Sequence, residues 1–431
     1  MNNKKKVLII GGGGREHAIA WKLAQSEHVG EMVCAPGNAG IAELCRCVPV
    51  SAEDIEGLTK LAAAEKPDLT VVGPEMPLAL GITDALEGLG LKVFGPNKKC
   101  SELEASKAFT KAFLARHEIP TAAYKEYTDA DALRKDIGIY GFPMVLKADG
   151  LAAGKGVIIA EDEEAAEQAV RELMESRAFG AAGDKVVVEE YLRGTEASML
   201  CFVDGSAIVP MESAQDYKRI FDGDEGPNTG GMGTYSPSLL FDEKTEQRVA
   251  EDILLKTLEG FKKDGLDFKG ILFVGLMLTK DGPKVIEFNN RFGDPETQSI
   301  LPRLKSDIYE IFIAATEDRL ADMSIEWNHN IKTVTVVMAA GGYPGSYKKG
   351  DPIHGLENLP EGITVFHAGT SSLPGAEGDA TIHTNGGRVL GVLGTGSTHE
   401  EARAKAYEGV AQIKFDGAVF RKDIGIVYEV S

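Results

Sequence analysis

Long apolar runs are absent from this 431-residue chain. None reaches the about 20 residues that a membrane-spanning helix needs, and the short basic N-terminus leads into a strand pattern without the apolar core of a signal peptide. We therefore expect a cytoplasmic protein that does not engage a membrane. Cysteine is also scarce, and the five thiols show no zinc-type spacing, so reduced, structural thiols are expected.

Basic residues are fewer than acidic residues in this chain. The 46 Lys and Arg residues face 66 Asp and Glu residues, which gives a formal net charge of −20. General nucleic-acid binding requires a basic footprint, so no nucleic-acid partner is expected. A phosphorylated ligand would have to be met by local lysines, backbone amides and metal ions. Glycine, in contrast, clusters in runs between apolar strand patterns, which is typical of ligand loops.

The length predicts several domains, because a single hydrophobic core rarely grows to this size. Residues 1–100 alternate short apolar strands with helical patterns, which predicts a doubly wound parallel sheet. A linker helix is predicted over 101–120, and a small α+β unit over 121–190. A larger sheet unit follows over 191–328, and a β-rich module over 329–431. The predicted fold class is therefore a mixed α/β and α+β multidomain protein.

The first glycine run follows an apolar strand and precedes a helix, so its free amides form a candidate anion site. A dinucleotide fold would need a closing glycine and an acid at the end of the second strand. The closing positions are Glu16 and His17, and the second strand ends without a carboxylate, which disfavours NAD. A phosphorylated sugar is the expected guest, and a tight turn without a ligand is the structural alternative. The predicted contacts are Gly12, Gly13, Gly14, Glu16, Asn38, Pro74 and Glu75.

Lys147 lies on an apolar strand, where an unpaired ammonium group would be costly to bury. The following loop, 149–156, is typical of a flap over phosphates, but it is not a P-loop because a glycine follows its lysine. An edge-strand lysine facing water is the alternative for Lys147, and a solvated helix lysine is the alternative for Lys107. The predicted phosphate contacts are Lys107, Lys147, Gly154, Lys155 and Gly156.

An acidic segment ends the next apolar strand. Glu189 could accept a hydrogen bond from the amine of adenine, and the backbone of Tyr191 and Leu192 could contact the ring edge. Glu196 lies within reach of ribose hydroxyls. A solvent-exposed acidic turn explains the same residues.

Alternation along a later strand places Glu287 and Asn289 on one face, with their neighbours pointing into the core. Magnesium prefers a few oxygen ligands and completes its shell with substrate phosphates, so these two are the metal candidates. Arg291 follows at once, with a planar fork suited to a carboxylate or a phosphate. Asp294 lies just beyond it. A polar strand end without a ligand is the alternative.

A long polar loop over 213–237 carries Asp216 and a second glycine run. Loops of this length inside a compact domain tend to be functional or disordered. We therefore predict an active-site loop.

The motifs in this order resemble the ATP-grasp ligases, and within them the glycinamide ribonucleotide synthetase (phosphoribosylamine–glycine ligase) family. The resemblance extends over essentially the whole chain. It rests on the segments 11–18, 36–38, 72–75, 147–157, 230–237 and 289–298.

The resemblance implies a central ATP-grasp fold formed by 121–190 and 191–328, with phosphoribosylamine bound by 1–100. It implies ATP-dependent ligation of glycine to 5-phosphoribosylamine through glycyl phosphate, in purine biosynthesis. The implied cofactors are ATP and Mg²⁺ or Mn²⁺, the partners are small molecules, and the protein would be a monomer or a weak dimer. Arg291 would hold the glycine carboxylate or the acyl phosphate, and Asp216 and Asp294 would orient an amine.

Three other functions compete with this one. A sister ATP-grasp enzyme, such as a carboxylase, would cleave ATP in response to bicarbonate. A nucleotide-sensing protein would bind ATP tightly without turnover. A nicotinamide dehydrogenase is the weakest alternative, because the first glycine loop lacks its partner acid.

Overall fold

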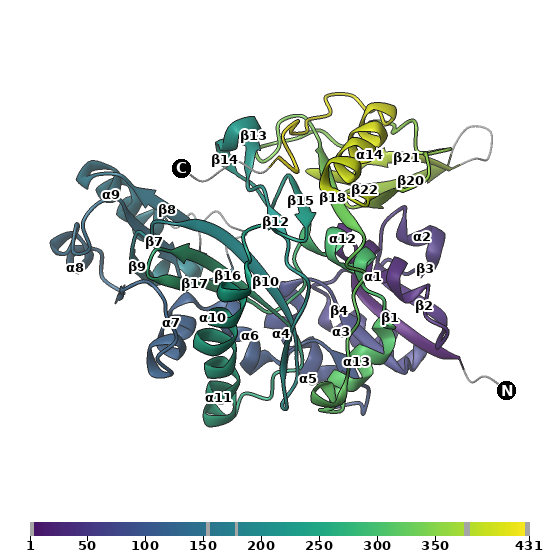
Figure 1. Ribbon diagram of the computed structural model, residues 1–431. Helices are drawn as coiled ribbons and strands as arrows, with labels where there is room; N and C mark the ends of the chain where they lie inside the picture. The colour runs from purple at the N-terminus through teal and green to yellow at the C-terminus, as the bar shows by residue number, and fades with distance from the viewer. Residues whose placement is uncertain (1–3, 152–155, 177–179, 375–379, 427–431) are drawn as a thin grey trace.

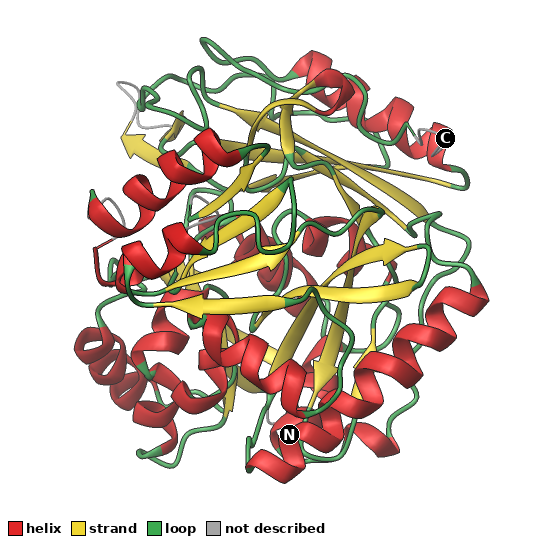
Figure 2. Ribbon diagram, turned by 90° about the vertical axis from the view of Figure 1, so that its left-hand side faces the viewer, coloured by secondary structure: helices red, strands yellow, loops and turns green. Residues whose placement is uncertain are grey.

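The computed structural model describes residues 4–151, 156–176, 180–374 and 380–426. Figure 1 shows the N-terminal unit at the lower right, two central sheets on the left and the C-terminal unit at the top. In the perpendicular view of Figure 2, strands occupy the middle of the molecule and most helices lie outside them. Among the described helices, none is both long and apolar enough to cross a membrane.

The N-terminal unit is a five-stranded parallel sheet in the order β3-β2-β1-β4-β5. On β1, Val7 and Ile9 enter one apolar core and Leu8 and Ile10 enter another, so both faces are covered. This confirms the predicted parallel sheet. Its elements are β1 (Lys5–Gly11), α1 (Gly14–Leu23), β2 (Val29–Pro36), α2 (Ile41–Leu44), β3 (Arg46–Cys47), α3 (Ile55–Glu65), β4 (Leu69–Val72), α4 (Glu75–Leu80), α5 (Ile82–Glu87) and β5 (Val93–Phe94).

The predicted single linker helix over 101–120 is wrong, because two helices occupy this part of the chain: α6 (Lys98–Ala105) and α7 (Lys107–Arg116). Ser106 breaks them apart with an extended backbone, at φ −128° and ψ 116°. Its hydroxyl accepts a hydrogen bond from the amide of Phe109 at 3.0 Å, which caps α7. The same hydroxyl donates to Asp149 Oδ1 at 2.9 Å. The break therefore ties α7 to the strand that carries Lys147.

Two antiparallel sheets follow, in the orders β6-β9-β7-β8 and β11-β10-β16-β17. The first comprises β6 (Tyr124–Tyr127), α8 (Ala130–Lys135), β7 (Met144–Ala148), β8 (Val157–Ala160), α9 (Glu163–Val170), the π-helical turn η1 (Arg171–Glu175), η2 (Gly180–Asp184) and β9 (Val186–Glu190). The second comprises β10 (Thr195–Val203), β11 (Ile208–Pro210), α10 (Glu243–Val249), η4 (Ala250–Leu254), α11 (Leu255–Asp264), β16 (Gly270–Thr279) and β17 (Gly282–Asn289). Each sheet has its own apolar core.

The C-terminal sheet has the order β12-β15-β18-β22-β19, and α14 packs on it. Its elements are β12 (Gln215–Asp216), β15 (Gly233–Ser236), β18 (Lys332–Ala339), β19 (Ile363–His367), β22 (Arg388–Gly396) and α14 (His399–Gln412). The sequence placed β12 and β15 in the unit 191–328, but β15 pairs with β18 through Thr234 and Thr335. A pairing across about 100 residues leaves no local signal in the sequence. As a result, the polar loop 213–237 joins the C-terminal sheet to the central ones.

The remaining elements connect these units. They are β13 (Arg219–Phe221), η3 (Asp222–Asp224), β14 (Glu225–Asn228), α12 (Glu296–Ile300), η5 (Leu301–Arg303), α13 (Ile308–Thr316), η6 (Leu320–Asp322), β20 (Thr370–Pro374) and β21 (Ala380–Thr384). Helix α12 touches α1, β15 and β18, so it lies where the N-terminal and C-terminal units meet.

Candidate active site

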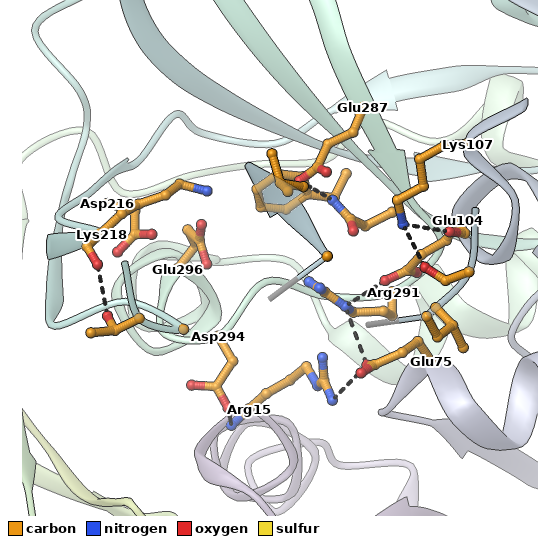
Figure 3. Close-up of a pocket in the computed structure, with 18 of the residues that line it drawn as sticks. Arg15, Glu75, Glu104, Lys107, Asp216, Lys218, Glu287, Arg291, Asp294 and Glu296 are labelled. Carbon is orange, nitrogen blue, oxygen red and sulfur yellow. Dashed lines mark hydrogen bonds and ion pairs between the residues drawn. The ribbon is translucent and has the colours of Figure 1, made fainter. Parts of the chain in front are cut away.

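A cavity of about 350 Å³ opens where the units meet, and residues distant in sequence line it (Figure 3). Among the predicted site residues, it brings together Glu75, Lys107, Gly156, Asp216, Glu287, Asn289, Arg291 and Asp294. It also contains Glu296, which the sequence places with Asp294 as a further acid beyond Arg291, and four charged residues to which the sequence assigned no role: Arg15, Glu104, Lys218 and Arg388.

The predicted metal pair lies on β17 and faces the cavity. Phe288 between the two is buried in the core, and Asn290 donates through Nδ2 to the carbonyl of Cys100 at 3.2 Å. The prediction is confirmed for Phe288, whereas Ile286 is half-buried and lines an adjoining recess, because the pairing of β17 with β16 is irregular at this point. Asn289, and not Asn290, faces the cavity. Burial raises the pKa of Glu287, but Lys218, Lys107 and Lys147 outweigh burial and hold this pKa below its ordinary value.

The residues present fit a divalent cation that shares its shell with a ligand. Glu287 supplies a carboxylate and Asn289 an amide, 3.4 Å apart at their closest polar atoms. Within the described part of the chain, no cluster of three or more His, Cys, Asp or Glu residues forms a closed metal site. Such an incomplete oxygen set suits Mg²⁺, which keeps water or phosphate oxygens in its shell.

Lys147 is buried, so the alternative of an edge lysine facing water is wrong. Its Nζ lies 2.9 Å from Glu189 Oε1 and 3.3 Å from the carbonyl of Ile286. Lys111, which the sequence did not single out, lies 2.8 Å from the other carboxylate oxygen of Glu189. Burial lowers the pKa of Lys111 to about 8 although Glu189 opposes this. Both oxygens of Glu189 therefore face ammonium groups, and its predicted contact with adenine stays a prediction.

The other residues predicted to contact the nucleoside lie outside the main cavity. Tyr191 is 37% exposed, and the guanidinium of Arg193 lies 5.6 Å from its ring centroid. Leu192 is half-buried and Glu196 is exposed. Glu196 lines a separate small recess with Asp216 and Glu287. The roles of these residues in binding adenosine stay predictions.

Lys107 stands at the start of α7, beside the predicted flap. Its Nζ donates to the carbonyls of Glu104 and Gly150, at 3.2 Å each. Gly150 and Gly156 line the cavity from the two ends of the flap. The predictions on Gly154 and Lys155 fall outside the described residues.

A chain of alternating charges crosses the cavity floor (Figure 3). Arg15 Nη2 lies 3.9 Å from Glu75 Oε2, which lies 3.5 Å from Arg291 Nε. Arg291 Nε is in turn 3.4 Å from Glu104 Oε1. Burial raises the pKa of Glu104, and Arg291 opposes this shift. The two acids fix the Arg291 guanidinium while part of its fork still faces the cavity.

The N-terminal glycine loop is braced by two of the predicted sugar contacts. Glu16 accepts from the Gly13 amide at 2.6 Å and from Arg15 Nε at 2.7 Å. Asn38 donates through Nδ2 to the carbonyls of Gly12 at 3.0 Å and His367 at 2.8 Å. Both side chains are engaged within the protein, and direct contact with a sugar stays a prediction for them.

The remaining predicted sugar contacts have different environments. A Cβ on Gly12 would lie 2.5 Å from the carbonyl oxygen of Gly37, and one on Gly14 would lie 2.5 Å from Gln298 Nε2. Close packing therefore explains these two glycines without a ligand. Pro74 caps α4, and Glu75 at its first position presents a carboxylate to the cavity.

The two predicted catalytic acids have opposite electrostatic environments. Burial, together with Glu296, raises the pKa of Asp216 well above its usual value. Burial acts in the same direction on Asp294, but Arg388 and Arg15 outweigh it and lower that pKa. Asp294 Oδ1 also accepts from Gln298 Nε2 at 2.9 Å. The site thus combines one acid whose pKa is raised with one acid whose pKa is lowered.

The comparisons with known proteins agree with this geometry. Three phosphoribosylglycinamide synthetase models match the chain: the N domain over residues 5–104, the ATP-grasp (A) domain over 105–297 and the C domain over 333–427. The chain belongs to the phosphoribosylglycinamide synthetase family. The predicted family and the predicted ATP-grasp fold are both confirmed.

Two relatives are similar to this chain along nearly their whole length. The phosphoribosylamine–glycine ligase of Caldanaerobacter subterraneus subsp. tengcongensis is 49% identical over 423 residues, which cover 98% of this chain and 100% of that protein. The crystal structure of the Thermotoga maritima phosphoribosylamine–glycine ligase is 35% identical with a TM-score of 0.85, and covers 97% of this chain and 99% of its own.

A more distant structure shares the fold alone. The biotin carboxylase domain of Hydrogenobacter thermophilus 2-oxoglutarate carboxylase, solved with MgADP and bicarbonate, is 17% identical with a TM-score of 0.72. The match covers 96% of this chain and 91% of that one.

Two cavity residues, Lys218 and Arg388, received no role from the sequence, and only the first could have been found from it. Lys218 alternates with Asp216 across Tyr217, so the alternation argument used for β17 would have found it. Arg388 lies on β22 and donates to the carbonyl of Asp294 at 2.6 Å, from 94 residues along the chain. Only the folded structure reveals a contact of this kind.

Proposed function

We propose that this chain catalyses the ATP-dependent ligation of glycine to 5-phosphoribosylamine, forming glycinamide ribonucleotide, ADP and phosphate in purine biosynthesis. The observation that carries the proposal is the composition of the cavity. It combines oxygen donors for a divalent cation, ammonium groups for phosphates and guanidinium groups for a carboxylate. Phosphoryl transfer depends on positioning and charge neutralisation more than on a protein nucleophile, so this set of groups is suited to the reaction.

At the ATP end, Glu287 and Asn289 would hold Mg²⁺ or Mn²⁺. Such a cation would neutralise negative charge on the bound phosphates. Lys107 and Lys147 would add positive charge on the side of α7 and β7. The distant biotin carboxylase structure contains MgADP, which supports the same use of this fold here.

For the nucleoside, we propose that the backbone of Tyr191 and Leu192 and the carboxylates of Glu189 and Glu196 contact adenosine. The position of β9 beside the Lys147 strand supports this assignment, because Val145 on that strand pairs directly with Glu189.

At the glycine end, Arg291 is oriented before any substrate binds, since Glu75 and Glu104 hold its guanidinium. Its fork would bind the glycine carboxylate and then the acyl phosphate that forms on transfer of the γ-phosphoryl group. Gly150 and Gly156 lie over the same space, and closure there would protect glycyl phosphate from water.

The amine of phosphoribosylamine would then attack the acyl carbon and lose a proton. Asp294, kept ionised by Arg388 and Arg15, would hold the amine through a hydrogen bond. Asp216, whose pKa is raised, would take the released proton, because a base works best with a pKa near the operating pH. Two carboxyl groups with separated pKa values can thus take different parts in one reaction.

The phosphoribosyl group would lie against the glycine loop, with its phosphate near the amides of Gly12–Gly14 and its hydroxyls near Glu75. We also propose the division 1–100, 101–120, 121–190, 191–328 and 329–431, with two helices in the linker and with β12 and β15 pairing into the C-terminal sheet. The family-model limits support this division in outline. Because the proposed substrates are small polar metabolites, we place the reaction in the cytoplasm, with the protein a monomer or weak dimer. Light scattering measures the oligomeric state directly.

Glycine labelled with oxygen-18 in its carboxylate tests the proposed intermediate. If glycyl phosphate forms, one labelled oxygen passes to inorganic phosphate in each turnover. Unlabelled phosphate together with formation of glycinamide ribonucleotide would contradict this mechanism.

A further inference from the structure

Three of the five cysteines lie together at the edge of the N-terminal sheet, and the proposed reaction does not use them. Cys34 on β2 pairs in register with Cys47 on β3. Cys45 comes directly before β3, and its thiol interacts with that of Cys47, whose Sγ also donates to the carbonyls of Asn38 and Cys45 at 4.0 Å each. Cys34 is completely buried, whereas Cys45 and Cys47 are half-buried.

The three thiols differ in acidity. The hydrogen bond from Cys45 lowers the pKa of Cys47, against the effect of burial. The same hydrogen bond raises the pKa of Cys45, and burial raises that of Cys34 well above the usual value. Since the thiolate is the nucleophilic form of cysteine, Cys47 is the first of the three to react with an electrophile.

Cys45 and Cys47 can be joined if the short edge segment that carries them contracts. Cys45 is extended, at φ −158° and ψ 168°, and leads into β3, so the two side chains project to one face. Residues two apart on a strand have Cα atoms about 6.6 Å apart, at a rise of about 3.3 Å per residue. A disulfide tolerates Cα separations up to about 6.8 Å but needs Cβ atoms about 3.5–4.5 Å apart, closer than parallel side chains on a regular strand. The backbone at residues 45–47 must therefore contract when the bond forms, which leaves the disulfide strained and easily reduced.

We propose that Cys45 and Cys47 are an oxidation-sensitive pair that reacts with hydrogen peroxide, with Cys47 as the attacking thiolate and Cys45 as the resolving thiol. The Cys47 sulfur attacks one peroxide oxygen, the O–O bond breaks, and hydroxide leaves a sulfenic acid. The Cys45 sulfur then forms the S–S bond and displaces the sulfenic oxygen, which departs with the Cys45 proton as water. In sum, two thiols lose two electrons and two protons, and peroxide becomes two waters.

The Cys47 sulfur also supports the turn below the glycine loop. A Cβ on Gly37 would lie 2.3 Å from Cys47 Sγ, so the turn packs directly on this sulfur. The Gly37 amide donates to the carbonyl of Gly11 at 3.1 Å, and the adjacent Asn38 holds Gly12. When the Cys47 side chain rotates toward Cys45 to form the disulfide, its sulfur no longer packs against Gly37. Given the proposed function, oxidation weakens phosphoribosylamine binding and leaves ATP binding on the central sheets unchanged.

Peptide mapping tests the pairing without any activity measurement. Trypsin cuts after Arg46, between the two cysteines, and a glutamate-specific protease cuts after Glu43, which separates Cys34 from them. After treatment with peroxide and blocking of free thiols, we expect 44–46 and 47–53 to remain joined by a bond that dithiothreitol breaks. The Cys45→Ser variant should instead retain a Cys47 sulfenic acid that dimedone traps. Full blocking of both thiols, or a bond between Cys34 and Cys47, would overturn the proposal.

Kinetics test the consequence of the pairing. We expect peroxide to raise the KM for phosphoribosylamine about tenfold, with the Kd for ATP unchanged and full recovery in dithiothreitol. The double variant Cys45→Ser/Cys47→Ser should be insensitive to peroxide. If the disulfide forms and KM does not change, the pair does not control the glycine loop. If the untreated protein has no ligase activity, the proposed function fails, and peptide mapping still decides the pairing.

Discussion

Replacing Glu287 with glutamine tests the metal site most closely, because the change keeps the shape of the side chain and removes only its charge. The side chain of Glu287 is half-buried at the cavity wall, and Lys218, Lys107 and Lys147 hold the pKa of its carboxyl below the ordinary value. The three lysines thus stabilise one negative charge at this position. The variant loses this charge and one of the two anionic oxygens offered to the cation.

We expect kcat/KM for ATP to fall by about 10²- to 10³-fold, which corresponds to about 3–4 kcal/mol of transition-state stabilisation. Half-maximal activity should also require a higher concentration of Mg²⁺, because the remaining amide of Asn289 is a weaker ligand than a carboxylate. Steady-state rates measured over a magnesium series give both quantities.

Glu65→Gln is a matched control for this change. Glu65 pairs with Lys6 and Arg46 on the N-terminal unit and does not line the cavity. It should lose no activity, since a partly exposed ion pair contributes at most about 1 kcal/mol to stability. Turnover of Glu287→Gln at the normal rate in low magnesium would refute the assignment.

Three further predictions concern neighbouring residues. Asn289→Ala should raise the magnesium requirement with little change in the free energy of unfolding. Asn290→Ala should instead lower the free energy of unfolding by about 1–3 kcal/mol, because it removes a buried hydrogen bond. Equal effects of the two variants in urea titrations and rate assays would contradict this distinction. Lys147→Ala should weaken ATP binding and leave Glu189 with Lys111 as its partner; an unchanged Kd for ATP by calorimetry would count against the role. Because the pKa of Asp216 is raised in the folded state, the folded protein retains a proton that the unfolded chain releases, and this group costs stability as pH rises above the ordinary Asp pKa. Relative to the parent, Asp216→Asn should therefore gain stability between pH 4 and pH 7. The variant should also lose the acid limb of the pH–activity profile.

Much of the N-terminal unit and of β17 could be predicted from the sequence, because local patterns determine them. The apolar strand Val7–Ile10 is buried on both faces, and an uninterrupted apolar run is the direct signature of that burial. At β17 the period of two separates Glu287 and Asn289 from Phe288 without any tertiary knowledge. Site residues that lie on a single strand can be predicted from the periodicity of that strand.

The parts that were missed depend on contacts between distant segments. One cap at Ser106 divides the helix predicted over 101–120, and the hydroxyl that makes the cap also donates to Asp149, directly after β7. The ion pairs of Glu189 with two lysines, from α7 and β7, were not expected from the sequence. Arg388 enters the cavity from β22 in the C-terminal sheet. No window of sequence contains both partners of such a contact.

ADP release in the presence of ATP and magnesium is the most direct measurement of the central claim. Glycine and freshly prepared phosphoribosylamine would be added singly and together, with bicarbonate as a parallel condition. The account predicts sustained release only when both substrates are present, with one ADP formed for each glycinamide ribonucleotide. Release driven by bicarbonate, or tight ATP binding without release under any combination, would contradict it.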